Sequence, residues 1–330
     1  MLQLVCGLVL LVVGADLLVR GAARLASLLG LSPFAIGVTV VAFGTSAPEL
    51  FASANAAWKG AGDLGVGNVV GSNIANVLLI LGITGVLSPV TVKRAVLRSG
   101  LPIMLAVSLG ASLMLAMGDQ TLGRVEGAVL VAGLVGYVVY SFIEGRADPD
   151  SIAHEFEREV EEDLHIDQRE PVSRLWIDLA LVIVGLAGLT FGSDLLVAGA
   201  TSLATDVLGV SAGVVGLTVV AFGTSLPELA ASVRACLTRQ HDIAMGNIIG
   251  SNVFNLLSVL GISALLAPMP ARPGIETDLL IMIAAGVLCY PLLSLVRLAP
   301  PRTIGRVQGT VMVLLYVGYT AYVYAVERGG

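Results

Sequence analysis

GVTVVAFGTSAPELFAS, Gly37–Ser53, occurs a second time, almost unchanged, as GLTVVAFGTSLPELAAS, Gly216–Ser232. Of the 19 residues that begin at each glycine, 14 are identical between the copies, which excludes a chance match. Each copy places one glutamate, Glu49 or Glu228, inside an otherwise apolar stretch. An ionised side chain at the centre of a bilayer costs about 2.5–3.5 kcal/mol. The two matched glutamates therefore need a compensating partner, and we expect that partner to be a cation.

The composition is that of an integral membrane protein. Apolar residues make up 56% of the 330 residues and charged residues 13%, whereas soluble domains carry about 25% charged residues. The mean hydropathy is +0.92. A spanning helix needs about 20 apolar residues. On this basis we expect an all-α membrane protein with ten transmembrane helices, at 2–19, 33–57, 64–87, 96–117, 125–143, 175–199, 211–237, 243–268, 279–296 and 307–326.

The ten expected spans fall into two related halves. From Glu49 onward the copies keep a constant offset of 228 − 49 = 179, so that Asn68 matches Asn247 and Asn76 matches Asn255. Five spans is an odd number, so the second half must enter the membrane from the opposite side. The sequence thus predicts two inverted five-helix repeats, residues 1–143 and 175–330, joined by a linker, residues 144–174.

The linker and the basic residues predict the orientation. Residues 144–174 hold eleven acids and four arginines, and we interpret them as a solvated hinge, with a calcium-sensing role as the alternative. With the linker inside, 14 of the 18 Lys and Arg residues, including Arg20 and Arg24 in a first inner loop, lie on the cytoplasmic side. This bias places both termini outside and the linker in the cytoplasm. Small size suggests a prokaryotic plasma membrane.

Each copy also predicts a broken helix. Pro48 cannot donate a hydrogen bond to the carbonyl of Gly44, and its ring crowds that carbonyl, so the helix should open around Gly44–Ser46. Pro227 should have the same effect in the second copy. Irregular backbone at membrane depth is tolerated where it lines a cavity, and hard cations such as Ca²⁺ take carbonyl and carboxylate oxygens together. The doubled motif therefore indicates a cation site.

The segments that follow carry a second motif, GNVVGSNIAN from Gly67 and GNIIGSNVFN from Gly246. In the first copy Asn68, Ser72 and Asn76 recur every four residues, which puts them on one helical face. Asp63 and its match Asp242 are expected to cap these helices. Asp16, which stands one turn before Arg20, is expected to form a local ion pair.

A doubled GTS-x-PE followed by GN-x-x-GSN closely resembles the alpha repeats of sodium/calcium exchangers, in the cation/calcium exchanger superfamily. The resemblance covers both repeats and the ten-span plan. It implies that Glu49 and Glu228 are the central Ca²⁺ ligands, assisted by the carbonyls of Thr45 and Thr224. It further implies flanking Na⁺ sites and two asparagines beside the centre. These residues are Ser46, Ser72, Ala42, Ser225, Ser251 and Ala221, with Asn76 and Asn255.

The function expected from these residues is exchange of Na⁺ for Ca²⁺ by alternating access. Some relatives, including potassium-dependent ones, carry aspartate where this chain has Asn255, so we expect transport without K⁺. A proton/calcium exchanger and a cation channel remain as alternatives. Neither enzymatic activity nor a cofactor is expected, because no nucleophile–base pair or histidine cluster lies in the spans. Ca²⁺, Na⁺ and the bilayer are the expected partners of a monomer, and no nucleic acid is expected.

Overall fold

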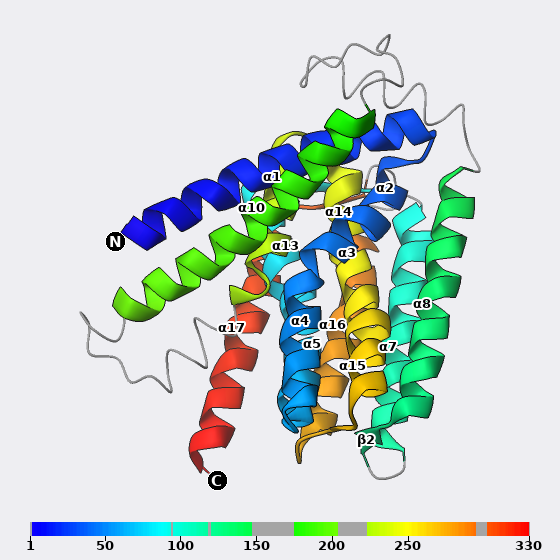
Figure 1. Cartoon of the computed structure of the whole chain (residues 1–330), viewed down its shortest axis with the longest axis vertical. Helices are drawn as coiled ribbons and strands as arrows, with labels where there is room; N and C mark the ends of the chain where they lie inside the picture. The colour runs from blue at the N-terminus through cyan, green and yellow to red at the C-terminus, as the bar shows by residue number, and fades with distance from the viewer. Residues whose placement is uncertain are drawn as a thin grey trace.

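The computed structural model describes residues 2–93, 95–117, 120–146, 175–203, 223–294 and 302–329. Long apolar helices dominate these residues (Figure 1). Six of them are long and apolar enough to cross a membrane, and a bent pair, Pro33–Thr45 with Ala47–Trp58, makes up to seven. The chain is therefore a multi-pass membrane protein. Most of the acidic linker and the start of the span expected at 211–237 lie outside the described residues.

The repeat is visible in the helix boundaries. Helix α4 (Ala47–Trp58) and helix α13 (Leu226–Leu237) begin and end at residues that differ by 179. The same offset relates α5 (Gly62–Ala75) to α14 (His241–Phe254). A π-helical segment follows directly in each case, and its first residue is an asparagine. These segments are η2 (Asn76–Ile80) and η7 (Asn255–Leu260).

The described residues contain further helical elements in both halves. They are α1 (Leu2–Leu29), α2 (Pro33–Ile36), η1 (Gly37–Val41), α3 (Ala42–Thr45), α6 (Leu81–Leu87), η3 (Val96–Gly100), α7 (Leu101–Ala116), α8 (Arg124–Gly145), α10 (Leu175–Ser202), α15 (Gly261–Leu266), α16 (Ile275–Ser294) and α17 (Arg306–Gly329). The end of α8 and the start of α10 lie at one end of the molecule, and the C-terminus lies at the other (Figure 1).

Helices α1 and α10 form a tight antiparallel pair that lies obliquely across the rest of the bundle (Figure 1). Glycines spaced seven residues apart make the close approach possible. A Cβ atom added at Gly14 would lie 2.8 Å from the carbonyl oxygen of Gly185, and one added at Gly7 would lie 2.6 Å from the amide nitrogen of Leu196. Small residues at such an interface let two backbones touch in a membrane. The spacing therefore holds α1 and α10 together as a unit.

Helix α1 is longer than expected. The apolar stretch predicts a span at 2–19, but the helix continues to Leu29, so the prediction that Arg20 and Arg24 lie in a loop is wrong. Both arginines have carboxylate partners: Arg20 Nε lies 3.0 Å from Asp16 and Arg24 Nη1 lies 3.6 Å from Asp178 of α10. Pairing offsets the cost of placing these charges on a helix that is packed against others.

Two short strand pairs connect the halves. Strand β1 (Val90–Val92) pairs antiparallel with β4 (Arg302–Ile304), and β2 (Thr121–Leu122) pairs antiparallel with β3 (Met269–Pro270). In each pair one strand comes from the first half and one from the second.

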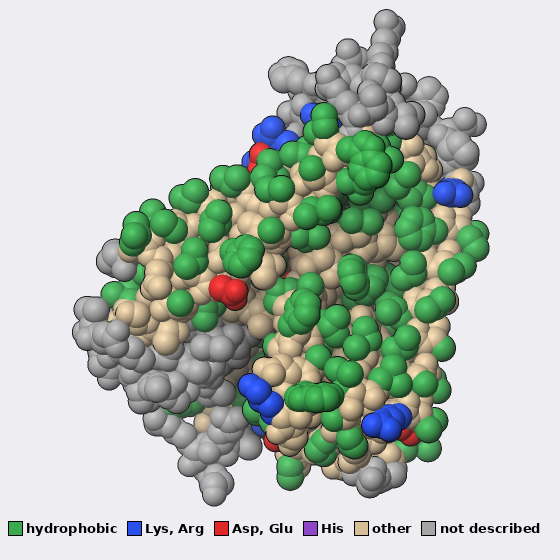
Figure 2. Space-filling view, viewed as in Figure 1, with side chains coloured by type: hydrophobic (Ala, Val, Ile, Leu, Met, Phe, Trp, Pro, Cys, Tyr) green, Lys and Arg blue, Asp and Glu red, His purple; other side chains and the backbone are tan. Residues whose placement is uncertain are grey.

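The surface agrees with a lipid environment. Hydrophobic side chains are spread over the face shown in Figure 2, and few charged side chains appear among them. Large apolar side chains such as Phe51 and Trp58, each 75% exposed, lie on the outside of the bundle. Contiguous apolar surface of this extent marks contact with a membrane or a protein. Buried polar residues include a group at the two helix breaks, among them Ser46, Glu49, Ser225 and Glu228.

Candidate functional site: two crossed helix breaks

The helix breaks occur where the prolines predict them. Helix α3 ends at Thr45, Ser46 adopts φ −82° and ψ 4°, and α4 begins at Ala47 with Pro48 in its first turn. The two axes differ by 45°. In the second copy Ser225 adopts φ −89° and ψ 4° immediately before α13. The predicted opening of the backbone is confirmed in both copies.

Each break places its glutamate at the start of the helix that follows. Glu49 lies in the first turn of α4 and Glu228 in the first turn of α13. The partial positive charge at a helix N-terminus favours a carboxylate there. Both side chains are buried, at 0% and 1% exposure. The break before each helix thus places both glutamates as buried acids.

The serine hydroxyl group at each break binds the glutamate of the opposite repeat. Ser46 Oγ donates to Oε1 of Glu228 at 3.2 Å, and Ser225 Oγ donates to Oε1 of Glu49 at 3.5 Å. Ser225 Oγ also lies 3.4 Å from Ser72 Oγ on α5. Each carboxylate is therefore oriented by the serine of the opposite repeat, and the two halves share one polar centre.

Helix α14 supplies a further layer of oxygen atoms. Thr45 Oγ1 donates to Asn247 Oδ1 at 3.0 Å and lies 3.4 Å from Ser251 Oγ. Asn247 Nδ2 in turn donates to Ser232 Oγ at 3.0 Å. The matched bond in the first repeat, from Asn68 Nδ2 to Ser53 Oγ, measures 3.1 Å. These amides fix the two motif helices against α13 and α4.

Several oxygens at this centre have no hydrogen-bond partner among the described residues. They are Oε2 of Glu49, Oε2 of Glu228, Oδ1 of Asn76 and Oδ1 of Asn255, all of them buried. A buried polar atom without a partner costs about 1–3 kcal/mol, and a charged one costs more. Carboxylate, amide and hydroxyl oxygens together are the ligands that hard cations prefer. The set has the oxygen chemistry of a hard-cation site.

The described residues contain no cluster of three or more His, Cys, Asp and Glu side chains. The site thus combines two acids with neutral oxygens.

The other predicted site residues are placed as follows. Ala42 is buried, and its carbonyl oxygen accepts a hydrogen bond from the amide of Ser46 at 3.0 Å and lies 3.4 Å from the hydroxyl oxygen of Thr45. Thr224 is half-buried and lines a cleft next to the centre. Ala221 lies outside the described residues.

The predicted helix caps are wrong. Asp63 and Asp242 each occupy the second position of a helix, after caps at Ala61 and Gln240. Gly60, at φ 77°, lies in the turn after α4, and α5 starts two residues later at Gly62. Asp242 instead forms an ion pair with Lys93, with Nζ 2.6 Å from Oδ2.

A cleft of about 580 Å³ leads to the centre from one side. Its walls come from α4, α5, α16 and α17, and its inner end reaches Ser72, Thr224 and Ser225. Gly67 and Gly71 on α5 border this cleft, and a Cβ atom added at either would meet no described residue within 4 Å.

The matched face of α14 is closed. A Cβ atom added at Gly246 would lie 2.7 Å from the carbonyl oxygen of Phe34, and one added at Gly250 would lie 2.6 Å from Cα of Val38. The first repeat's α2 and η1 thus pack directly on α14. Among the described residues, α14 is thus covered at Gly246 and Gly250, whereas α5 has no such cover at Gly67 and Gly71; residues 212–220, which match α2 and η1 in the repeat, lie outside the described residues.

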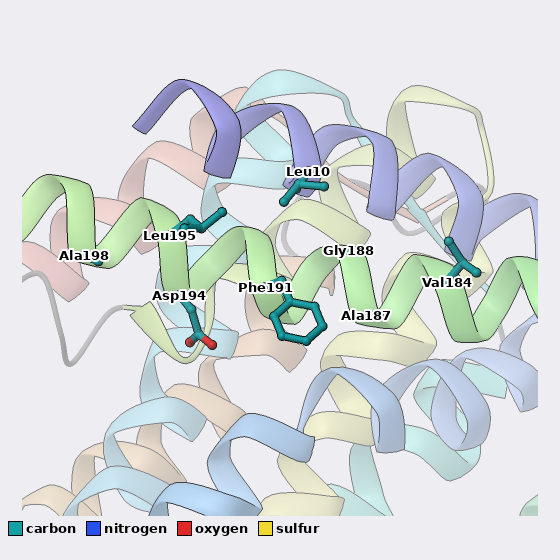
Figure 3. Close-up of a pocket in the computed structure, with 8 residues that line it drawn as sticks. All are labelled: Leu10, Val184, Ala187, Gly188, Phe191, Asp194, Leu195 and Ala198. Carbon is teal, nitrogen blue, oxygen red and sulfur yellow. The ribbon is translucent and has the colours of Figure 1, made fainter. Parts of the chain in front are cut away.

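A second asymmetry separates Asp16 from its repeat match, Asp194. Asp16 binds Arg20 on its own helix and Arg234 on α13, which ties α1 to α13. The local pair with Arg20 confirms the prediction. Asp194 is exposed on α10, and among the described residues it forms no ion pair. Asp194 and the neighbouring Phe191 point away from α1 (Figure 3).

Comparison with known proteins places these features in one family. The family described as "Sodium/calcium exchanger protein" matches residues 1–143 and 177–325. The chain is 42% identical to the "Putative antiporter CaxA" of Alkalimonas amylolytica, over 95% of both proteins. It is 32% identical to "Sodium/calcium exchanger MaX1" of Methanosarcina acetivorans, over 98% of both.

Solved structures of the sodium–calcium exchanger NCX_Mj share the fold. The one soaked with 10 mM Na⁺ and zero Ca²⁺ superposes with a TM-score of 0.80 and 30% identity, over 97% of both chains. The repeated motifs, the helix breaks and these matches agree, and the chain belongs to the sodium/calcium exchanger family.

Proposed function

We propose that the protein is an antiporter that exchanges Na⁺ for Ca²⁺ at the crossed helix breaks, by alternating access. The observation that carries the proposal is the pair of buried glutamates, each with one carboxylate oxygen free of a hydrogen-bond partner among the described residues. Two carboxylates balance the charge of one Ca²⁺. Glu49 and Glu228 then serve as the central calcium ligands, together with Thr45, Thr224, Asn76 and Asn255.

Antiport follows from shared ligands. Ser46, Ser72 and Ala42, with their matches Ser225, Ser251 and Ala221, flank the glutamates and provide neutral oxygens for Na⁺. A site refilled by Na⁺ cannot hold Ca²⁺ simultaneously, because both ions need the same carboxylates. Exchange of three Na⁺ for one Ca²⁺ moves one net charge in each cycle.

Alternating access requires the two motif helices to exchange their packing. Among the described residues, α14 is covered by α2 and η1, whereas a Cβ atom added at Gly67 or Gly71 of α5 would meet nothing within 4 Å. If the ten helices form two inverted repeats, exchange of these two arrangements closes one side of the membrane and opens the other. The α1–α10 pair moves as a unit, and the bond between Asp16 and Arg234 holds it in the present position.

Uptake by proteoliposomes tests which two ions are exchanged. In Na⁺-loaded proteoliposomes, ⁴⁵Ca²⁺ uptake is expected to need the outward Na⁺ gradient and to proceed without K⁺. An inside-positive potential is expected to accelerate uptake, because net positive charge leaves in each cycle, worth about 2.3 kcal/mol per charge per 100 mV.

Two results would contradict sodium–calcium exchange. Uptake driven by a pH gradient alone, with no Na⁺ present, would indicate a proton/calcium exchanger. Uptake that follows the Ca²⁺ gradient and is indifferent to every counter-ion would indicate a channel.

Cysteine labelling tests the proposed orientation, with both termini outside and the acidic linker in the cytoplasm. Single cysteines at Lys59 and at Glu161 of the linker, in a cysteine-free background, are expected to react oppositely with an impermeant maleimide in intact cells. Lys59 lies between α4 and α5 and should be labelled, whereas Glu161 should be labelled only after lysis. Labelling of both residues in intact cells would rule out five spans in the first half.

A further inference from the structure

Three buried asparagines form a hydrogen-bonded relay beside the two glutamates. Asn73 Nδ2, on α5, donates to the backbone carbonyl of Asn252 at 3.1 Å, and Asn255 Nδ2, at the start of η7, donates to Asn73 Oδ1 at 3.1 Å. All three residues are at most 2% exposed. Segment η7 packs against α4, the helix that carries Glu49.

The relay has only one consistent orientation. A backbone carbonyl can only accept a hydrogen bond, so Asn73 must turn its NH₂ group toward Asn252. Its Oδ1 atom then faces Asn255, which must donate a hydrogen bond from its own NH₂ group. Consequently the Oδ1 atom of Asn255 points elsewhere, and it has no hydrogen-bond partner among the described residues. The backbone carbonyl of Asn252 thus determines that the oxygen of the Asn255 amide, and not its nitrogen, is left without a hydrogen-bond partner among the described residues.

The matched residues of the other repeat do not form this relay. Asn252, the counterpart of Asn73, donates its Nδ2 atom to the carbonyl of Ile248 on its own helix at 2.7 Å. Asn76, the counterpart of Asn255, has neither amide atom bonded among the described residues. The two asparagines of the centre therefore differ: Asn255 is held with its oxygen free, and Asn76 is not held.

We propose that Asn73 is a positioning residue, which presents the Asn255 oxygen to the transported Ca²⁺ as a neutral ligand. The inference rests on the proposed function, because Asn255 must be a ligand for its orientation to matter. It also accounts for asparagine at position 255. A carboxylate there would set one of its oxygens against Asn73 Oδ1, and the two acceptors would repel each other. An amide at position 255 can donate a hydrogen bond to Asn73 Oδ1, whereas a carboxylate cannot.

Replacement of Asn73 tests the relay. Asn73→Leu keeps the branched shape but removes both hydrogen bonds, and the Ca²⁺ concentration for half-maximal uptake is expected to rise about tenfold, the size of one hydrogen bond. The maximal rate at saturating Ca²⁺ is expected to change much less. Ser108→Ala is the control, because it removes a buried side-chain hydrogen bond to the carbonyl of Met104 on α7, outside the relay, and it should leave the half-maximal concentration unchanged.

A double-variant comparison shows whether Asn73 acts through Asn255. Asn255→Ala alone is expected to raise the half-maximal Ca²⁺ concentration, and adding Asn73→Leu to it should raise it no further. Additive effects, or a half-maximal concentration that Asn73→Leu leaves at the wild-type value, would overturn the proposal. If Asn73→Leu does not give folded protein, the smaller Asn73→Ser, which cannot make both bonds, replaces it with the same expected rise.

The same experiment separates this inference from the proposed function. Wild-type protein without Na⁺-dependent ⁴⁵Ca²⁺ uptake, or an Asn255→Ala variant with wild-type half-maximal Ca²⁺, would contradict the proposed site. Failure of the relay alone would appear as normal wild-type exchange and a weakened Asn255→Ala variant, with Asn73→Leu unaffected.

Discussion

Replacement of Glu49 or Glu228 by glutamine is expected to abolish calcium transport and to leave the protein folded. Each substitution removes half of the negative charge that balances Ca²⁺. Loss of one member of a buried charge pair costs about 3–5 kcal/mol, so Ca²⁺ affinity should fall by more than about 100-fold. Glutamine has nearly the same shape as glutamate and can still accept the hydrogen bonds from Ser225 and Ser46.

The measurement is Na⁺-driven ⁴⁵Ca²⁺ uptake, with monodispersity in detergent as the check on folding. Glu276→Gln is the matched control, since Glu276 is an exposed glutamate whose side chain binds Gln120 at 2.6 Å, at the start of α16. It should transport normally. Near-normal calcium flux in either central variant would refute the assignment of the two glutamates.

Alanine at Gly250 and alanine at Gly71 are expected to behave differently, although the two positions match in the repeat. At Gly250 the new Cβ atom would lie 2.6 Å from Cα of Val38, which forces α14 and η1 apart. Overpacking of this kind costs about 1–3 kcal/mol. At Gly71 the Cβ atom would meet none of the described residues within 4 Å. Gly250→Ala should therefore lower the midpoint of thermal unfolding in detergent, and Gly71→Ala should not.

Transport gives the second half of this comparison. If the repeats exchange their packing in each cycle, Gly71 must be covered in the opposite state as Gly250 is covered here, and Gly71→Ala should slow turnover by about tenfold or more. A Gly71→Ala variant with wild-type turnover would speak against such an exchange. Equal destabilisation by the two alanines would mean that both faces are packed alike.

The helix breaks could be predicted from the sequence because their cause is local. Pro48 lacks an amide hydrogen wherever it stands in a helix, and the repeated motif required the same geometry at Ser225. The burial of Glu49 and Glu228 also followed from the apolar residues around them. The effect of a proline on its own helix, and of apolar neighbours in the sequence, does not depend on how the helices are arranged.

The partners of these residues could not be predicted, because they depend on the packing of distant segments. Nothing in the spacing indicates that Ser46 donates to Glu228 of the other repeat. Asn73 stands outside the stripe of polar residues spaced four apart, and its bond to the Asn252 carbonyl exists only after α5 meets α14. The length of α1 was likewise underestimated, because Arg24 is compensated by Asp178 from another helix.

The two strand pairs have a consequence for the symmetry of the molecule. Strands β1 and β3 occupy equivalent places in the halves, as do β2 and β4, yet β1 binds β4 and β2 binds β3. An exchange of the two halves would therefore turn one strand pair into the other, which is the self-complementary contact of a twofold-symmetric dimer. At the strand pairs, the two halves of this single chain are related as the two subunits of such a dimer would be.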